Sequence, residues 1–558
     1  MQHCSSFLHL IRRLAGVRHH RGRNTAAKPA SGDPPPPTSS LPLDRLYGRT
    51  VVVDVEAWLL RPPVHAFTYF MVVAVEAGGF LRGLLLLLLY PLLCAFLGDG
   101  RGGARGRAMA TVALIGLEEE EVARVGRAVL PRFFLEAAAA EGVEAVRAAR
   151  RSVAVSATFP RVMVEAFLRE HVGVDAVVGP ELRSVAGVVA GLVDEGDAAE
   201  VAARRLRALL GDETEEGKQG GAAAVGLVGE GRSGGTVHHL FSRYYCKETF
   251  TASEADKRRP LPPGKCGVEP LVFHDGRLAF PPTPSAALAM YAYLPFGVAL
   301  AVSRVVALSL LPYRVTFLVG AATGVHYRLV AGPRHHAPDA DGAAVAGGGG
   351  GGGGGRLYVC NHRTLLDPVV VATALGKPVT AVTYSLSRVS EMIAPIRTAR
   401  LTRNRERDRR DMAALLARGD LVVCPEGTTC REGYLLRFSP LFAELGADVN
   451  PVALDTSVDM FYGTSTTPAA KWMDPFYFMM NPKPSYRVEF LPRAAAVAAA
   501  AEDGDDRRCS SIRVANRVQR QIGEALGFEL TGMTRKDKYM MLAGNEGAVA
   551  AAAIKAKK

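Results

Sequence analysis

A histidine and an aspartate five residues apart form the clearest chemical pair in the sequence. His362 and Asp367 lie in the segment NHRTLLDP, directly after the apolar run LYVC at 357–360. A carboxylate at this spacing can accept a hydrogen bond from Nδ1–H of the imidazole and leave Nε2 to accept a proton. No serine or cysteine stands beside the pair in a recognisable nucleophile elbow, so the pair would activate a hydroxyl group of the substrate. The alternative is a His–Asp capping interaction on a surface loop.

Two further segments place polar groups where strands are expected to end. The segment RLTRNRERDRR at 400–410 is rich in arginine, and CPEGTTCREGYLLRF at 424–438 follows the apolar stretch LVV. The tetrapeptide PEGT would form a corner between strand and turn, and such corners suit a phosphate or another polar ligand. A short buried strand, NPVALD at 450–455, is expected next. This order of segments favours a catalytic site over an isolated capping pair.

Together these segments resemble the four blocks of the glycerolipid acyltransferase superfamily: H-x-x-x-x-D, an arginine-bearing second block, P-E-G-T and a P-V-A strand. RLTRNRERD and CPEGTTCREGYLLRFSPLFAEL are similar to the land-plant glycerol-3-phosphate acyltransferases of the cutin and suberin type. The resemblance covers residues 356–530 and implies an acyltransferase domain of the α/β class there.

The resemblance also implies a reaction and a role for each matching residue. An acyl group would pass from acyl-CoA to a hydroxyl of glycerol 3-phosphate, expected to be sn-2, giving lysophosphatidic acid for cutin, suberin or glycerolipid synthesis. His362 would take the proton from that hydroxyl, Asp367 would orient His362, and Arg403 would hold the phosphate through two hydrogen bonds. The substrate pocket would be lined by Pro425, Glu426, Gly427 and Thr428. Acyl-CoA is a co-substrate, and no cofactor is expected.

The N-terminal region at 48–250 resembles a phosphatase domain of the haloacid-dehalogenase type, and VSATFPRVMVEAFL is the clearest stretch. The first motif of that family reads D-x-D-G-T. Here it reads DVEAW, so Asp54 is kept and Glu56 replaces the acid/base aspartate. The loop GLVGEGRSGGT, which should supply metal-binding aspartates, contains none, and a Mg²⁺ site is not expected without them. The resemblance therefore implies a degenerate phosphatase domain without activity, which would act as a scaffold.

Length and charge fit a membrane-associated enzyme of several domains. The chain has 558 residues, and 67 Lys and Arg against 55 Asp and Glu give a net charge of +12. Nucleic acid is not expected as a partner, because only 7% of residues are aromatic and no base-stacking pattern accompanies the basic runs. The eight cysteines form no C-x-x-C pair and no N-x-[ST] sequon occurs, which favours a chain that faces the cytosol.

Two apolar regions are candidates for membrane contact. The first is an apolar insertion at 80–98, whose uncharged part would span about 24 Å as a helix, less than a bilayer core of roughly 30 Å. It is expected to insert as a hairpin or to lie in the interface, and a long buried core helix is the alternative. The second, at 284–325, contains a run long enough to span. Pro295 and Pro312 make a re-entrant hairpin an equal alternative to two spans.

The remaining segments are expected to lack a packed core. Residues 1–47 form a basic, Pro-rich arm, interpreted as a mitochondrial transit segment or as an unstructured arm. Residues 331–355 form a Gly-rich loop, and 531–558 are expected to be a mobile tail. The predicted location is the endoplasmic reticulum membrane with the catalytic domain facing the cytosol, and a mitochondrial membrane is the alternative. The sequence leaves the oligomeric state open.

The predicted fold is therefore α/β throughout: a haloacid-dehalogenase-like domain, membrane-embedded apolar helices and an acyltransferase domain. Two other functions stay open. One is a bifunctional acyltransferase and phosphatase that yields monoacylglycerol, which the replacements at 54–58 disfavour. The other is a non-catalytic membrane scaffold, which the intact motifs at 361–368 and 424–428 disfavour.

Overall fold

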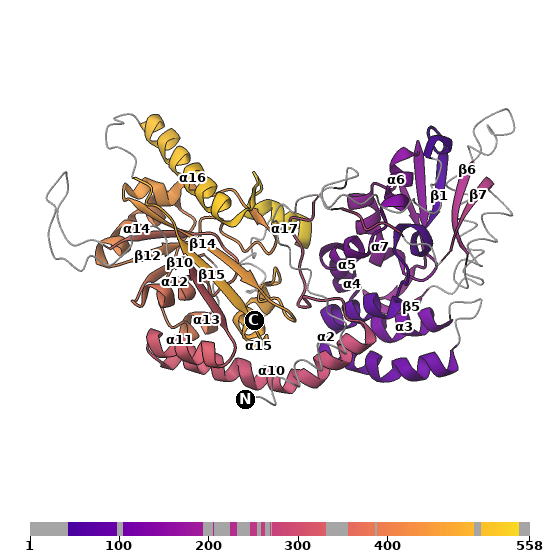
Figure 1. Ribbon diagram of the computed structural model, residues 1–558, viewed down its shortest axis with the longest axis horizontal. Coiled ribbons are helices and arrows are strands. Elements are labelled where there is room, and N and C mark those ends of the chain that lie inside the picture. Colours follow the sequence, from indigo (N-terminus) through magenta and orange to yellow (C-terminus); the bar gives the residue numbers. More distant parts are fainter. Residues whose placement is uncertain are drawn as a thin grey trace, which may run out of the picture. The chain divides into compact units, whose positions relative to one another are not determined.

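The chain forms two compact units (Figure 1). The computed structural model describes residues 43–97, 104–192, 205, 224–230, 246–253, 258–262, 268, 270–330, 355–384, 388–495 and 504–545. Unit 1 comprises Met1–Leu271 and Pro281–Ala292, and unit 2 comprises Val272–Phe280 and Tyr293–Lys558. Most of the predicted N-terminal arm, nearly all of the Gly-rich loop and the last 13 residues of the predicted tail, 546–558, lie outside the described residues.

Unit 1 is built on a parallel sheet in the order β3-β2-β1-β6-β7. Its strands are β1 Thr50–Asp54, β2 Arg151–Val155, β3 Ala176–Val178, β6 Ala224–Glu230 and β7 Cys246–Ser253. The central strand β1 is buried at every position, as its sequence TVVVD predicts for a parallel strand covered on both faces. The predicted α/β class is confirmed here.

Helices and one hairpin complete unit 1. They are α2 Ala66–Phe96, α3 Ala104–Leu114, α4 Glu119–Ala128, α5 Leu130–Ala137, α6 Ala140–Ala148, α7 Arg161–Ala166 and the pair β4 Leu182–Val185 and β5 Val188–Leu192. The predicted insertion at 80–98 is only the second half of α2, which bends at Gly79, where φ is +79°. The first half is buried, whereas Leu81 and Phe96 in the second half are more than 80% exposed.

Unit 2 contains a mixed seven-stranded sheet in the order β11-β10-β12-β9-β14-β15-β8. The strands are β8 His326–Val330, β9 Leu357–Cys360, β10 Thr380–Thr383, β11 Arg397–Arg400, β12 Leu421–Val423, β14 Val449–Ser457 and β15 Ser485–Phe490. Neighbours are parallel except for β14 and β15. Strands β9 and β12 are adjacent and parallel, so the segments that follow them meet at the same edge. This topology brings the two predicted motifs together.

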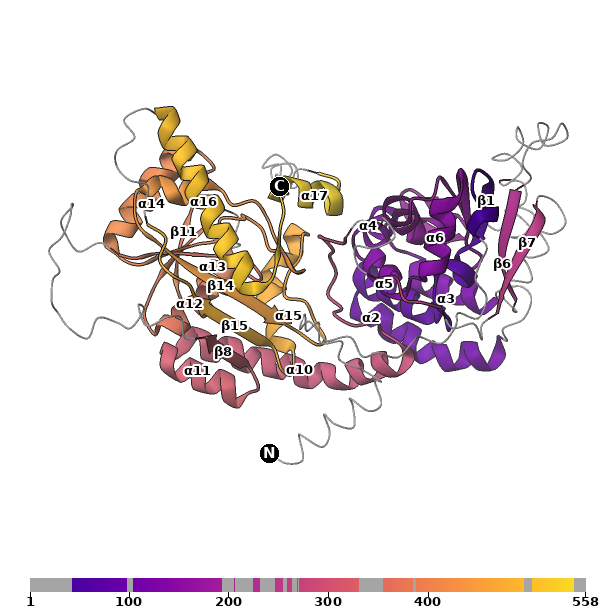
Figure 2. The same cartoon turned by 45° about the horizontal axis from the view of Figure 1, so that its top comes forward.

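Helices cover the sheet of unit 2 (Figures 1 and 2). They are α10 Pro284–Leu310, whose first residues belong to unit 1, α11 Tyr313–Ala322, α12 Asp367–Leu375, α13 Arg388–Ile393, α14 Arg405–Arg418, α15 Asp474–Met480, α16 Gly504–Leu526 and α17 Arg535–Ala543. A hydrophobic core joins β9, β12 and β14 to α14 and α16, with Val359, Met412 and Val518 among its members. That packing fixes the strand ends that carry the polar motifs.

Besides α10 and α11, unit 2 includes a strand and a helix that lie outside the predicted acyltransferase range 356–530. Strand β8 pairs in parallel with β15, and α17 follows residue 530. The prediction of a mobile tail at 531–558 is wrong for the described part of it, because α17 begins with a capping box of Thr534 and Asp537 and buries Lys538. This helix is hard to predict because its apolar residues form no clear stripe.

The predicted membrane region at 284–325 forms α10 and α11. Pro295 lies inside α10, and Pro312 immediately precedes α11. Arg304 of α10 is 2% exposed, and its guanidinium donates hydrogen bonds to the carbonyl oxygens of Met479 (2.7 Å) and Asn481 (2.6 Å) and also to that of Thr323. One side of α10 is therefore attached to protein. By length and composition, α2 and α10 are both candidate membrane spans.

Candidate active site

His362 and Asp367 meet at the end of β9, as the sequence predicted. The side chain of Asn361 exchanges two hydrogen bonds of 2.8 Å with the backbone of Leu454 on β14, which fixes the chain where it leaves the strand. His362 follows in the turn, and Asp367 begins α12. His362 Nδ1 lies 2.9 Å from Asp367 Oδ2. Nε2 is therefore the ring nitrogen left to accept a proton.

Four further hydrogen bonds hold the fully buried Asp367 carboxylate in place. Oδ2 accepts from the backbone nitrogens of Arg363 (2.5 Å) and Thr364 (2.9 Å), and Oδ1 accepts from the hydroxyls of Thr364 and Tyr486, both at 3.2 Å. Charge-assisted bonds of this kind fix an anion strongly. Tyr486 comes from β15, more than a hundred residues away in sequence, and no motif in the sequence indicates its role.

The environment of His362 favours its protonated form. Burial opposes a charged imidazolium, but the neighbouring Cys424 sulfur and the Asp367 carboxylate favour it, and the pKa of His362 is raised well above its usual value. Contact with Cys360, whose sulfur lies 3.5 Å away, and burial raise the pKa of the Cys424 thiol well above its usual value. A thiol with a raised pKa is protonated at physiological pH and then acts on His362 only as a hydrogen-bond partner, whereas Asp367 supplies the negative charge.

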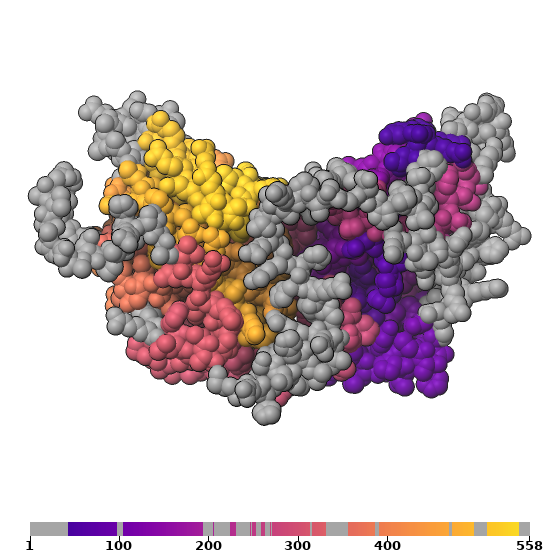
Figure 3. Space-filling view, viewed as in Figure 1, coloured from indigo at the N-terminus to yellow at the C-terminus, as the bar shows by residue number. Residues whose placement is uncertain are grey.

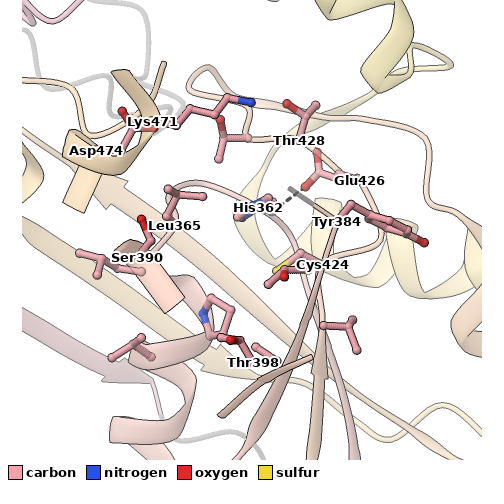
Figure 4. Close-up of a pocket in the computed structure, with 18 of the residues that line it drawn as sticks. His362, Leu365, Tyr384, Ser390, Thr398, Cys424, Glu426, Thr428, Lys471 and Asp474 are labelled. Carbon is pink, nitrogen blue, oxygen red and sulfur yellow. Dashed lines mark hydrogen bonds between the residues drawn. The ribbon is translucent and has the colours of Figure 1, made fainter. Parts of the chain in front are cut away.

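The PEGT corner follows β12 and lies beside His362 (Figure 4). Glu426 is 4% exposed, and its carboxylate accepts hydrogen bonds from the backbone nitrogens of His362 (2.7 Å) and Leu436 (3.0 Å). Burial raises the pKa of Glu426 to about 7. Gly427 has φ of +67°, a conformation that favours glycine. Glu426 thus positions the histidine loop in addition to lining the cavity.

A cavity of about 610 Å³ opens in front of His362, entirely within unit 2. All four residues of the PEGT corner, Pro425, Glu426, Gly427 and Thr428, line it. Its apolar walls come from α10, α12, α13 and α15 and include Val305, Leu308, Val369, Ile393, Phe476 and Met479. Polar lining residues that the sequence reasoning missed include Arg437, Lys471, Thr534, Arg535 and Tyr539. The cavity in front of the histidine is thus lined by both apolar and polar side chains.

Arg403 lies in a smaller cavity of about 340 Å³, which shares six of its lining residues with the larger one, Gly427 and Arg535 among them. The backbone of Arg403 has φ of +68°, and its backbone nitrogen donates a hydrogen bond to the Asp408 carboxylate at 2.9 Å. Asp408, which is 1% exposed, also accepts from Thr402 and so closes the turn before α14. The predicted phosphate ligand is therefore beside the cavity of His362 and does not line it.

In unit 1, the predicted phosphatase residues occupy the end of β1. Asp54 is 3% exposed and accepts a hydrogen bond from the nitrogen of Ala57 at 2.9 Å. Burial, and then the charge of Glu56, raise the pKa of Asp54 to about 8, so its carboxyl group is largely protonated at neutral pH.

Glu56 binds to the segment that follows β2. Its carboxylate accepts hydrogen bonds from Ser156 Oγ (2.7 Å) and from the backbone nitrogens of Thr158 (2.9 Å) and Ala157 (3.4 Å). A hydroxyl and two amides at a strand end form a cradle for an anion, and here a carboxylate of the chain occupies it. With Glu56 bound in this way, its carboxylate is not free to join Asp54 in holding a Mg²⁺ ion. The predicted metal loop lies partly outside the described residues.

Comparison with known sequences identifies both units. Residues 50–252 match the domain family described as the glycerol-3-phosphate acyltransferase RAM2-like, HAD-like domain, and residues 338–455 match the acyltransferase family. Among solved structures, a substrate-bound phosphoserine phosphatase (13% identity, TM-score 0.25) covers 37% of this chain and 85% of its own. The lysophosphatidic acid acyltransferase PlsC from Thermotoga maritima (14% identity, TM-score 0.24) covers 42% and 95%. These scores are low, so the assignment rests on sequence.

Curated plant proteins match over nearly the whole chain. The probable glycerol-3-phosphate acyltransferase 2 of Arabidopsis thaliana is 41% identical over 90% of this chain and 91% of its own length. Glycerol-3-phosphate acyltransferase 1 of the same plant is 42% identical over 90% and 83%, and RAM2 of Petunia hybrida is 38% identical over 87% and 95%. The chain belongs to the glycerol-3-phosphate acyltransferase family of plants, with an N-terminal haloacid-dehalogenase-like domain and a C-terminal acyltransferase domain.

Proposed function

We propose that the protein transfers a fatty acyl group from acyl-CoA to the sn-2 hydroxyl of glycerol 3-phosphate and releases CoA and lysophosphatidic acid. The observation that carries the proposal is His362, held by the buried Asp367, in the wall of a cavity lined by both apolar and polar side chains. An acyl chain suits the apolar walls, and a phosphorylated polyol suits the arginines. The sn-2 position, and use of the product in cutin or suberin synthesis, rest on family resemblance alone.

The geometry supports a direct transfer. His362 Nε2 accepts the proton of the substrate hydroxyl while its oxygen attacks the thioester carbonyl carbon. The new C–O bond forms, the C–S bond breaks, and the CoA sulfur leaves and takes up the proton that His362 holds. Asp367 keeps Nδ1 protonated and stabilises the imidazolium that forms, which is the task of the aspartate in a serine hydrolase triad.

The test is an assay of purified membranes that contain the protein, with labelled glycerol 3-phosphate and a panel of acyl-CoA chain lengths. Label should enter a lysophosphatidic acid, and the position of the acyl group gives the regiospecificity. If no acyl-CoA in the panel supports incorporation above that of membranes without the protein, the proposed donor or acceptor is wrong.

Arg403 is proposed to bind the phosphate of glycerol 3-phosphate. Arg403→Lys keeps the positive charge and faces the same backbone strain at φ +68°, but it loses the two-pronged hydrogen bond. We expect KM for glycerol 3-phosphate to rise on the order of tenfold, with little change in KM for acyl-CoA. Arg400→Lys is the control, because Arg400 pairs with Glu391 and lies outside both cavities. Equal effects on both substrates would remove Arg403 from this role.

We propose that unit 2 binds a membrane through α10, α11 and α13. Exposed apolar side chains on these helices include Phe296, Val302, Leu310, Leu318 and Met392. Rose-coloured atoms, which include those of α10 and α11, reach the surface of this unit in the space-filling view (Figure 3). With Arg304 bound to protein on another side, α10 suits a hairpin embedded from one face. The proposed membrane is that of the endoplasmic reticulum, with the catalytic domain in the cytosol where acyl-CoA is present.

The protein is expected to stay in the membrane fraction after a high-salt wash, because salt weakens ionic contacts but not apolar ones. Replacing Leu310 and Leu318 together with glutamate should increase the soluble fraction. The matched control places glutamate at Asn516 and Arg520, which are exposed on α16. Release of the unaltered protein by salt would contradict membrane insertion, and protease protection of 356–530 in sealed microsomes would contradict the orientation.

A further inference from the structure

Helix α17 lies beyond the family motifs, yet it is attached to the active-site loop. Lys538 is 5% exposed, and its ammonium donates to the carbonyl oxygen of Thr429 (2.5 Å) and to its hydroxyl (3.3 Å). Burial lowers the pKa of Lys538 to about 8. The backbone nitrogen of Arg437 also donates to the carbonyl oxygen of Met533 at 2.9 Å. The start of α17 is therefore held against the segment that follows the PEGT corner.

This attachment places side chains of α17 in the wall of the catalytic cavity. Thr534, Arg535 and Tyr539 line it, and Arg535 also lines the smaller cavity that contains Arg403. The guanidinium carbon of Arg535 lies 4.7 Å from the centre of the Tyr539 ring, which restricts its orientation. Tyr539 in turn contacts the ammonium of Lys471. Arg535 is thus held in a restricted orientation and gives this part of the cavity wall a positive charge.

The charge in the smaller cavity is predominantly positive. Arg403, Arg405 and Arg535 line it, and Asp408 is the acidic residue among the described residues that line it. Asp408 is committed to the turn before α14, and Arg405 pairs with Glu444. Burial lowers the pKa of Arg535, and the charge of Arg403 acts in the same direction. The two guanidinium groups therefore repel one another. An anion bound between them would relieve this repulsion.

We propose that Arg535 of α17 and Arg403 together bind the phosphate dianion of the acyl acceptor, so that the C-terminal helix completes the acceptor site. The inference rests on the proposed function and adds a binding residue that lies outside the motif segments of the sequence. Two arginines on different elements can each present two donors to one phosphate. The phosphates of CoA share this chemistry, and separate kinetic measurements for the two substrates distinguish them.

The test compares Arg535→Gln with Lys536→Gln. Both remove one positive charge from the first turn of α17, but Lys536 is exposed and lines neither cavity. We expect KM for glycerol 3-phosphate to rise roughly 10- to 100-fold in Arg535→Gln and to change little in Lys536→Gln, with KM for acyl-CoA little changed in both. Arg535→Lys should give an intermediate KM for glycerol 3-phosphate. Thermal unfolding of both Arg535 variants then distinguishes weakened binding from loss of folding.

A double variant tests whether the two arginines share one ligand. If they do, the fold-change in KM for glycerol 3-phosphate in the double variant, Arg403→Gln with Arg535→Gln, will differ from the product of the fold-changes in the two single variants. Multiplicative effects, or a rise in KM for acyl-CoA alone, would overturn the shared acceptor site. If KM for glycerol 3-phosphate is the same in Arg535→Gln as in Lys536→Gln while the unaltered protein is active, this inference is wrong but the proposed function stands. Absence of glycerol 3-phosphate acylation by the unaltered protein would instead overturn the proposed function.

Discussion

Acyl transfer is expected to fall by about 10²–10⁴-fold when His362 is replaced with alanine, while the protein stays folded. The backbone of His362 donates to Glu426 and accepts from Cys430 at 2.9 Å, and alanine keeps both of these hydrogen bonds. Only the imidazole that accepts the substrate proton is lost. Turnover of His362→Ala close to that of the unaltered protein would contradict the proposed role of the histidine.

Asp367→Asn is expected to have a similar effect by another route. Both oxygens of the carboxylate accept hydrogen bonds. In asparagine an NH₂ group replaces one of these oxygens, so two donors would face each other at that position. The imidazole would lose its fixed tautomer, so kcat should fall more than KM changes. Asp411→Asn is the control, since Asp411 is half exposed on α14.

The pH profile provides an independent measurement of His362. The neutral imidazole is the form that accepts a proton, and its pKa is raised, so kcat/KM should increase as pH rises through a value above 6.5. In Asp367→Asn the anion that favours the imidazolium is absent. The rise in the remaining activity should therefore move to lower pH. An unchanged midpoint would mean that a group other than His362 controls the profile.

The sequence was most informative where chemistry is local. His362 and Asp367 lie within one turn, and the strands before them are short apolar runs, so their pairing followed from spacing. The carboxyl ends of parallel strands meet at one edge, which is why the PEGT segment could be placed beside the histidine.

Contacts made between distant segments could not be predicted in this way. Tyr486 reaches Asp367 because β15 runs antiparallel to β14, and a single sequence contains no signal for that register. Helix α17 was not predicted, in part because one of its attachments is a buried lysine on a carbonyl, whereas lysine usually indicates an exposed position. The prediction for Glu426 was incomplete for a similar reason. Its hydrogen bonds to the backbone of residues far away in the chain leave no pattern in the sequence.

The product of the reaction is expected to keep its phosphate. Release of phosphate by a haloacid-dehalogenase-type site would need an ionised aspartate as nucleophile and a second carboxyl group free to move a proton. Burial and the charge of Glu56 raise the pKa of Asp54 to about 8, which opposes the ionised form that a nucleophile needs. Trp58 is fixed by a hydrogen bond from its indole to the carbonyl oxygen of Val228 (2.9 Å), so a large ring occupies the place of a small hydroxyl residue.

Glu56 gives a second reason to expect no phosphatase activity. Its carboxylate already fills the cradle of Ser156 and Thr158 in which an anionic group could bind, and a phosphate would have to displace it. Labelled glycerol 3-phosphate should therefore yield lysophosphatidic acid and no monoacylglycerol above background on thin-layer separation, with the same result for Asp54→Ala. Monoacylglycerol formed equally by both proteins would indicate a contaminating phosphatase. Monoacylglycerol that disappears in Asp54→Ala would show that Asp54 is a working nucleophile and that Glu56 does not close the site.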